Sequence, residues 1–363
     1  MSELAADDRR WLDAAVALAE PRLGTTADNP TVGAIVVDAA TNAILGQGVT
    51  ASGGRPHAEP QALDQAGAAA RGATLYVTLE PCNHWGRTPP CADAVLRAGI
   101  ARVVIGIADP DPRTAGESIL RLRAAGLETV LADHEASRRL HEGHIAKKLL
   151  GRPFVTAKLA VSADGMIGRT GQANIPITGE DARRWTHLQR ARSDAVLVGG
   201  ATANIDNPQL TVRLPGLEDR RPLRLVLAGR ERLLPGLNLF ASRSTQPSVV
   251  IGLAETPVPS GIELLPVAGG RRPDLALAMT ALGDRGIGRL LVEGGAVLTA
   301  ALLEAGLVDR FHLLTSNRVI GDGGLPATAH GTMQERMAAA GFTLVDRKPL
   351  GVDNLHTFER QQV

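Results

Sequence analysis

Apolar and polar positions along the first 150 residues follow two alternating periods. Short apolar runs rich in Val, Ile and Leu predict strands at 32–37, 44–49, 74–79, 103–107 and 128–131. Ala- and Leu-rich stretches predict helices at 12–19, 58–66, 92–98 and 117–125, with Gly99 ending the third helix. The Thr41-Asn42 pair between the first two runs predicts a hairpin. Because strand and helix patterns alternate, we expect an α/β sheet covered by helices.

The pattern restarts near residue 151. A polar helical stretch at 137–150 is broken by Gly151-Arg152-Pro153, and we therefore predict one domain at 1–150 and another at 151–363. The second half predicts strands at 154–161, 195–198, 223–227, 249–252 and 289–292. Helices are predicted at 181–192 and from Gly294-Gly295 to about residue 304, and the Gly-, Pro- and Ser-rich stretch 228–270 indicates short strands in long loops.

Composition narrows the class of protein. A chain of 363 residues is long for one domain and suits two. Hydrophobic residues make up 44% and charged residues 21%, as in ordinary globular proteins, while only 2% aromatics means cores of Ala, Val, Leu and Ile. The formal charge of +1 argues against a surface built for a nucleic-acid backbone, so we expect no nucleic-acid partner.

The chain shows neither a secretory signal nor a membrane segment. Its first ten residues are charged and lack an apolar core, and no stretch approaches about 18 uninterrupted apolar residues. We therefore expect a cytoplasmic protein without a membrane partner. Its two cysteines, Cys82 and Cys91, are then expected to serve a metal or catalytic role rather than a disulfide.

The strongest chemical pattern is His57-Ala58-Glu59 followed by Cys82 and Cys91. Three nitrogen and sulfur ligands suit a catalytic zinc, which keeps a fourth position open for water and lowers its pKa to roughly 7. Glu59, near a helix start and two residues after His57, is placed to move protons as the catalytic carboxylate of a hydrolytic deaminase. Cys91 opens a helix, whose N-terminal field favours a thiolate.

Plainer interpretations of the same residues exist. An isolated H-x-E is common, and two cysteines separated by eight residues could be inert core thiols. A closed structural zinc site is an alternative, with His84 as the fourth ligand, and would make the protein a non-catalytic zinc protein. Because both features occur together, each at a predicted strand-to-helix junction, we favour catalytic zinc held by His57, Cys82 and Cys91.

A family resemblance is carried by the run from Thr78 to Cys91, which reads TLEPCNHWGRTPPC. It resembles the deaminase half of the bifunctional riboflavin-biosynthesis deaminase-reductases, because eight residues separate the cysteines where cytidine and tRNA-adenosine deaminases have C-x-x-C. The segment from Asn29 to Ala34 resembles that family's N-P-x-V-G, which implies that Asn29 holds the substrate ring. Arg87, in the loop between the cysteines, either approaches the substrate phosphate or simply faces water.

By itself the second half indicates only an α/β domain. A strand followed by Gly294-Gly295 and a helix can bind phosphate, but the G-x-G-x-x-G pattern is absent. Three segments resemble the reductase half of the same family in the family's order: 158–165, 194–213 and 292–295. The resemblance thus covers nearly the whole chain. It implies a cytidine-deaminase-like three-layer N-terminal domain and a dihydrofolate-reductase-like C-terminal domain that uses NADPH.

The resemblance also implies site residues in the second half. Those expected to meet NADPH are Ala160, Thr202, Asp206, Gly295, Ala296, Val297, Leu298, Thr299, Ala300 and Ala301. Those expected to meet substrate are Asn174, Arg190, Leu210, Arg213 and Glu293. Arg190 and Arg213 suit phosphate because a guanidinium fork matches its oxygens. Two positions depart from the family: Met166 replaces a Lys or Arg, and Pro176 replaces a Trp.

The activity implied is two-step. A phosphoribosylamino-diaminopyrimidine is deaminated at the zinc site, and NADPH then reduces the ribosyl group to the ribityl chain. The family forms dimers or tetramers, which implies a homo-oligomer. A nucleic-acid-editing deaminase with an accessory domain is the alternative among enzymes, and it predicts a basic groove with stacking aromatics.

Overall fold

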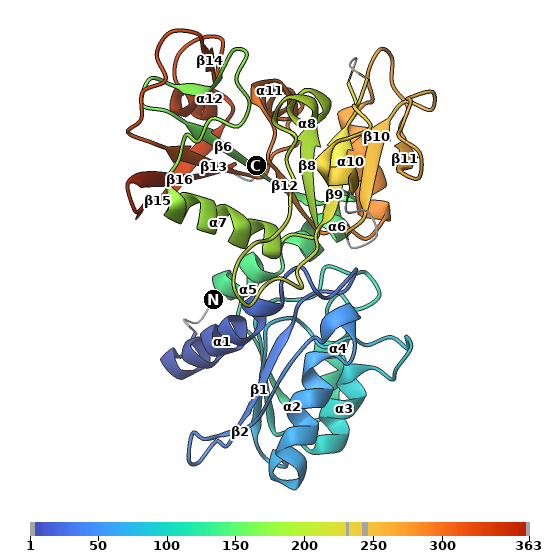
Figure 1. The fold of residues 1–363 in the computed structure, drawn as a ribbon. Coiled ribbons are helices and arrows are strands. Elements are labelled where there is room, and N and C mark those ends of the chain that lie inside the picture. The colour runs from blue at the N-terminus through green and yellow to red at the C-terminus, as the bar shows by residue number, and fades with distance from the viewer. Residues whose placement is uncertain (1–3, 230–231, 242–245, 361–363) are drawn as a thin grey trace. The chain divides into compact units, whose positions relative to one another are not determined.

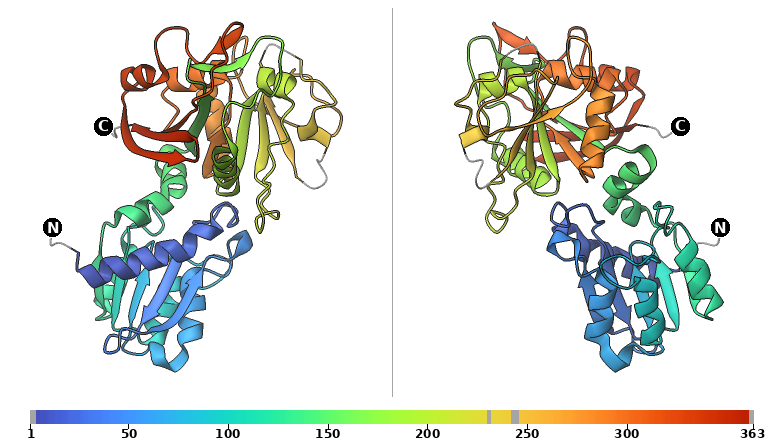
Figure 2. Two further views of the ribbon diagram at one scale, coloured as in Figure 1. Left: turned by 60° about the vertical axis from the view of Figure 1, so that its left-hand side comes forward. Right: turned by 90° about the vertical axis from the view of Figure 1, so that its right-hand side faces the viewer.

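The structure, a computed structural model, describes residues 4–229, 232–241 and 246–360. The chain forms two compact units, Met1–Gly151 and Arg152–Val363, and each is described by itself (Figures 1 and 2).

The first unit is built on a five-stranded sheet in the order β2-β1-β3-β4-β5. The β1–β2 pair and the β1–β3 pair are antiparallel, whereas β3, β4 and β5 run parallel. The parallel pairs each need a crossover connection, and α3 and α4 supply these. The strands are β1 (Gly33–Val37), β2 (Ile44–Val49), β3 (Thr74–Val77), β4 (Arg102–Ile105) and β5 (Glu128–Leu131).

Helices cover both faces of this sheet. Successive residues of a strand point to opposite faces, and accordingly Val36 packs in the core under α2, α3 and α4 while its neighbour Ile35 packs against α1. The unit is therefore a three-layer α/β/α arrangement. Its α-helices are α1 (Ala6–Ala19), α2 (Ala58–Ala66), α3 (Cys91–Ala98), α4 (Glu117–Ala124), α5 (Glu135–Leu140) and α6 (Glu142–Leu150), with 3₁₀ turns η1 (Glu20–Arg22), η2 (Ser52–Gly54) and η3 (Gly67–Ala70).

The second unit is built on a nine-stranded sheet in the order β11-β10-β9-β8-β12-β6-β13-β16-β15. The strands from β11 to β13 run parallel, and β16 and β15 close the sheet as an antiparallel pair. The strands are β6 (Phe154–Val161), β8 (Ala195–Gly199), β9 (Leu223–Leu227), β10 (Ser248–Gly252), β11 (Glu263–Pro266), β12 (Arg289–Val292), β13 (Arg310–Thr315), β15 (Phe342–Leu350) and β16 (Asp353–Arg360); β7 (Met166–Arg169) and β14 (Gly324–Pro326) form a small separate pair.

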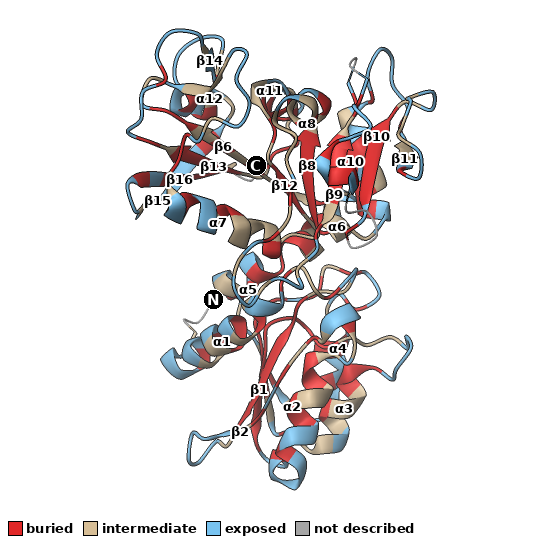
Figure 3. Ribbon diagram, viewed as in Figure 1, coloured by how far each residue is buried: buried red, intermediate tan, exposed pale blue. Residues whose placement is uncertain are grey.

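The nine-stranded sheet is also covered on both faces. Leu197 of β8 packs in the core with α10, α11 and α12, while its neighbour Val196 packs in a second core with α8 and α9. The central strands of both units are buried, whereas β15 is mostly exposed (Figure 3). The helices are α7 (Glu180–Ala191), α8 (Gly200–Asp206), α9 (Asn238–Ala241), α10 (Leu275–Asp284), α11 (Ala296–Glu304) and α12 (Met333–Ala339).

Most predicted elements occur within a few residues of the expected positions, and α2, β2, β5, β6, β9 and β12 have the expected bounds. The helix expected to begin at Leu12 instead begins at Ala6, and the stretch expected at 137–150 is divided into α5 and α6 at His141. The elements β7, α8, α10, α12 and β13 to β16 were not predicted. Part of the predicted loop-rich stretch 228–270, residues 230–231 and 242–245, lies outside the described residues. Within the described ranges no helix has the length and apolarity that crossing a membrane requires.

Candidate active sites

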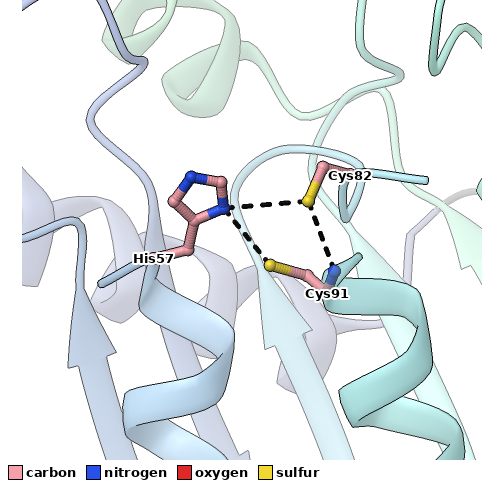
Figure 4. A group of neighbouring side chains, drawn as sticks. All are labelled: His57, Cys82 and Cys91. Carbon is pink, nitrogen blue, oxygen red and sulfur yellow. Dashed lines mark hydrogen bonds between the residues drawn. The ribbon is translucent and has the colours of Figure 1, made fainter. Parts of the chain in front are cut away.

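The first site lies where α2 and α3 begin. His57 directly precedes α2, Cys91 is the first residue of α3, and Cys82 lies in the loop after β3. The Nδ1 atom of His57 is 3.3 Å from Cys91 Sγ and 3.7 Å from Cys82 Sγ (Figure 4). All three candidate ligand atoms lie within 4.8 Å of one another. The fold therefore brings the three predicted ligands together from two helix starts and one loop.

The donor set fits one zinc ion. Zinc binds thiolate sulfur at about 2.3 Å and imidazole nitrogen at about 2.0 Å, so a tetrahedral ion separates its ligand atoms by roughly 3.5 to 3.8 Å. The two nitrogen–sulfur distances are close to that range. Among the residues that the structure describes, the group has three members, and His84, the fourth ligand of the closed-site alternative, is not one of them.

Glu59 is buried beside this group. It lies in the first turn of α2 with 3% of its surface exposed, and its Oε2 atom makes no hydrogen bond to any described residue. Burial, together with the negative charge of Cys82, raises the pKa of Glu59 to about 7. A carboxyl group that titrates near neutral pH can both accept and return a proton, which general acid–base catalysis requires.

The N-terminal end of α3 acts on Cys82 rather than on Cys91. The backbone N–H of Cys91 donates to Cys82 Sγ at 3.3 Å. Hydrogen bonds from Cys91, opposed by burial, lower the pKa of the Cys82 thiol to about 4. The same contact, together with burial, raises the pKa of the Cys91 thiol. The sequence predicted that the start of this helix favours a thiolate at Cys91. In the structure, the N–H group at the helix start points to Cys82 instead.

Two further residues that the sequence singles out, Asn29 and Arg87, belong to the same unit and lie in different surroundings. Asn29 is half-buried, and its amide approaches the turn at Gly54, three residues before His57. Arg87 lies exposed in the loop between the cysteines. That loop is tied down at Thr88, whose hydroxyl accepts a 2.6 Å hydrogen bond from Arg55.

The second site centres on an ion pair. Arg190 of α7 donates through Nε and one terminal nitrogen to Glu293 after β12, the second bond being 2.9 Å. Lys158 of β6 completes the group: burial lowers its pKa, against the opposing charge of Glu293. Burial would raise the pKa of Glu293, but the charges of Arg190 and Lys158 lower it. In the sequence Lys158 is the first residue of the segment 158–165, and its place in an alternating strand does not predict a charged partner 135 residues later.

Thr211 links the second site to Arg213 through two different atoms. Its carbonyl accepts hydrogen bonds from Arg190 and from His187 Nδ1, each 3.0 Å long. Arg213 is exposed, and its guanidinium donates to Thr211 Oγ1 at 2.9 Å. Leu210 has a left-handed backbone and a side chain that packs in the core, so a substrate contact there would come from the backbone.

Residues expected to meet the cofactor gather where α8 and α11 begin. Thr202 Oγ1 accepts the backbone N–H of Gly295 at 3.2 Å. A Cβ at Gly294 would lie 3.0 Å from the side chain of Leu298, so a larger residue there would displace Leu298. Thr299 Oγ1 is buried and has no hydrogen-bond partner in the described part of the chain. Gly294 and Gly295 precede α11 and carry no side chains that would cover its first turn. The free N–H groups of such a first turn can bind a cofactor phosphate.

The remaining expected residues lie elsewhere in this unit. Asn174 contacts Asp206, donating from its amide to the Asp206 carbonyl at 2.8 Å. Ala160 is on β6, opposite Leu314 of β13. Of the two departures, Met166 begins β7, and the carbonyl of Pro176 accepts a hydrogen bond from Arg318.

Two protein families match this chain. The family described as "Cytidine and deoxycytidylate deaminase zinc-binding region" matches residues 5–107. The family described as "RibD C-terminal domain" matches residues 153–353, more than half of the chain. The two matches confirm the predicted combination of a zinc deaminase fold and a reductase fold in one α/β protein.

Individual relatives resemble this chain along most of its length, across both units. A riboflavin biosynthesis protein RibD from Aquifex aeolicus is 37% identical over 87% of this chain and 88% of its own length. The structure of RibD from Acinetobacter baumannii superposes with a TM-score of 0.86 at 32% identity, over 98% of this chain and 99% of its own. A Thermotoga maritima structure, described as a diaminohydroxyphosphoribosylaminopyrimidine deaminase/5-amino-6-(5-phosphoribosylamino)uracil reductase, gives 0.86 at 31% identity, over 98% and 99%. The chain belongs to the RibD family of bifunctional deaminase-reductases of riboflavin biosynthesis.

Proposed function

We propose that His57, Cys82 and Cys91 hold the zinc of the deaminase and that Glu59 is its proton carrier. The observation that carries this proposal is the placement of three suitable ligand atoms within 4.8 Å beside a buried carboxyl group. When bound, zinc supplies an activated water molecule for attack on the amino-bearing carbon of the diaminopyrimidine. Glu59 takes up a proton and delivers it to the departing amine. Asn29 holds the pyrimidine ring.

We propose that the second unit binds the deaminated product by its phosphate and NADPH at the start of α11. When bound, NADPH supplies the hydride that reduces the ribosyl carbon. Arg213 presents its guanidinium to the phosphate, and Arg190 is kept beside it by Glu293. Asn174 and Leu210 line the substrate side. Thr202, Asp206, Ala160 and the turn Gly295, Ala296, Val297, Leu298, Thr299, Ala300 and Ala301 line the cofactor side.

The deaminase assignment is tested by following ammonia release from the phosphoribosylamino-diaminopyrimidine. Glu59→Gln is expected to retain stoichiometric zinc and lose roughly 10²–10⁴-fold of the deamination rate, because the proton carrier is gone. His57→Ala is expected to lose the metal. Glu135→Gln, which changes a surface carboxylate on α5, is the control. A Glu59→Gln enzyme that deaminates at the normal rate, or a His57→Ala protein that retains zinc, contradicts the respective role.

The reductase assignment is tested through NADPH oxidation with the deaminated substrate. Arg213→Ala is expected to raise KM for this substrate at least tenfold with a smaller change in kcat, because a charge-assisted bond to a phosphate contributes about 1.5–3 kcal/mol. Arg183→Ala, an exposed arginine of the same unit, is the control. An unchanged KM in Arg213→Ala would remove Arg213 from the substrate site.

We also propose that the enzyme is a cytoplasmic homo-oligomer acting on small molecules alone. The family resemblance supports this proposal. Light scattering of the full chain measures its mass, and a gel-shift test with tRNA measures binding to nucleic acid. A monomer, or a retarded tRNA band, would contradict it.

A further inference from the structure

One arginine outside the metal group contacts both segments that carry the cysteines. Arg121 of α4 donates to the side-chain oxygen of Asn83 at 3.0 Å and forms an ion pair with Asp93. Asn83 directly follows Cys82, and Asp93 lies two residues after Cys91 in the first turn of α3. A single guanidinium therefore spans the two ends of the intercysteine loop.

Glu80, two residues before Cys82, anchors helix α4, which carries Arg121, to the segment that leads to Cys82. Glu80 is 2% exposed, and its carboxylate accepts five hydrogen bonds. The donors are the backbone N–H groups of Asp109, Gly116, Ser118 and Ile119, at 2.9–3.3 Å, and the Ser118 hydroxyl at 2.9 Å. Because Gly116 to Ile119 form the start of α4, Glu80 fixes this helix start to the strand end that leads to Cys82.

The body of α4 is fixed as well, whereas Arg121 stays outside the core. Leu122 is fully buried and shares a core with Val95 of α3. The side chain of Arg121 is 42% exposed. Its removal therefore opens no cavity, and its effect on the metal group can be separated from an effect on packing.

We propose that Arg121 is a positioning residue of the metal centre, which sets the separation of the Cys82 and Cys91 segments from a helix start fixed by Glu80. This inference rests on the proposed assignment of Cys82 and Cys91 as zinc ligands. The eight-residue loop between the cysteines contains no regular element and is held at Thr88 by Arg55. Bracing its two ends lowers the conformational freedom that zinc binding must remove, and groups that orient ligands in this way raise metal affinity.

The test compares Arg121→Ala, Arg121→Lys and Arg123→Ala in the full chain. Arg123 belongs to the same helix but donates to the Thr129 carbonyl at 3.0 Å, so its removal controls for changes to α4. Zinc affinity is measured by competition with a chromophoric chelator, and ligand geometry by the absorption bands of the cobalt(II)-substituted protein. Arg121→Ala is expected to weaken zinc binding roughly tenfold and to shift the cobalt bands. The zinc affinity of Arg121→Lys should lie between those of Arg121→Ala and the unmodified chain, because an ammonium group cannot bridge both acceptors as the guanidinium fork does. Arg123→Ala should bind zinc as tightly as the unmodified chain.

Unchanged zinc affinity and unchanged cobalt bands in Arg121→Ala would overturn the inference. Asn83→Ala removes one acceptor of Arg121 without altering α4. It must show a smaller loss of zinc affinity than is expected for Arg121→Ala, and this test remains available even if Arg121→Ala does not fold. Equal losses in Arg121→Ala and Arg123→Ala would also overturn it, since the effect would then be that of the helix. If the unmodified chain binds no stoichiometric zinc, the metal assignment itself has failed and the inference fails with it.

Discussion

Three glutamates of this chain show how partners decide what a carboxyl group can do. Glu80 is fixed in place by five hydrogen bonds. Burial would raise the pKa of Glu293, but the charges of Arg190 and Lys158 lower it. Glu59 has an oxygen that no described residue satisfies, and its pKa is raised to about 7. Glu59 is therefore poised to exchange a proton near neutral pH, which follows from its surroundings rather than from its residue type.

At this scale His312 makes a testable contribution to stability. It is buried, with Trp185 packed edge-on 4.9 Å from its ring, and burial together with the charges of Arg310 and Lys348 lowers its pKa from 6.5 to about 3. Between these values the unfolded chain binds a proton that the folded chain does not. The free energy of unfolding therefore falls as pH drops below 6.5, by about 2 kcal/mol at about pH 5.

His312→Gln is expected to reduce this pH-dependent loss by about 2 kcal/mol, since glutamine does not titrate. The measurement is urea unfolding at about pH 7.5 and about pH 5, followed by Trp185 fluorescence in a chain carrying Trp11→Phe and Trp85→Phe. His330→Gln, at an exposed position, is the matched control. The same loss in His312→Gln and in the parent chain would show that His312 gains a proton while folded.

At the scale of elements, the sequence predicts those whose burial is periodic. Strand β6 alternates buried and half-buried positions along its whole length, and its predicted bounds hold. Strand β15 is almost entirely exposed, and after Phe342-Thr343-Leu344-Val345 its sequence turns polar, so no apolar period continues along it. Helix α10 is apolar on most positions and shows no amphipathic period, and α8 starts directly at the end of β8. The missed elements are those whose pattern is set by partners distant in sequence.

The same limit applies to the sites. His57, Glu59, Cys82 and Cys91 were identifiable because two local motifs contain them. Lys158 near Glu293, or Arg121 near Asn83 and Asp93, could not be found in this way, because each pair joins segments far apart in the chain. Residue types within a motif indicate chemistry, whereas the partners that tune it depend on how elements pack.

Two glycines of the first sheet give an element-scale prediction. A Cβ on Gly48 of β2 would overlap the carbonyl oxygen of Ala58, in the first turn of α2, whereas a Cβ on Gly33 of β1 would overlap the carbonyl oxygen of Ala15 in α1. Both Gly48→Ala and Gly33→Ala are expected to destabilise the first unit by about 1–3 kcal/mol through overpacking. Because α2 carries His57 and Glu59 at its start, we expect Gly48→Ala alone to weaken zinc binding as well.

Chelator competition and urea unfolding on the two variants separate these effects, with Gly33→Ala as the matched control. Equal zinc affinities in the two variants would contradict the prediction. His57 and Glu59 would then keep their positions even when α2 is pushed away from β2.

At the scale of the whole molecule, each unit has its own cores, and none of the hydrophobic clusters mixes described residues of the two. Zinc is assigned to the first unit and NADPH to the second. A ligand that binds only the folded form stabilises it by RT ln(1 + [L]/Kd), about 2.7 kcal/mol at one hundred times Kd. Each ligand should therefore stabilise one unit and leave the intrinsic stability of the other unchanged.

Calorimetry of the full chain is expected to show two thermal transitions. Removing zinc with a chelator should lower one of them, and NADPH at about one hundred times its Kd should raise the other by several degrees. His57→Ala, which lacks a proposed zinc ligand, should abolish the response to chelator and leave the response to NADPH intact. If instead both transitions moved together with either ligand, the units would unfold as one cooperative body. Separate cores would then not imply separate stabilities.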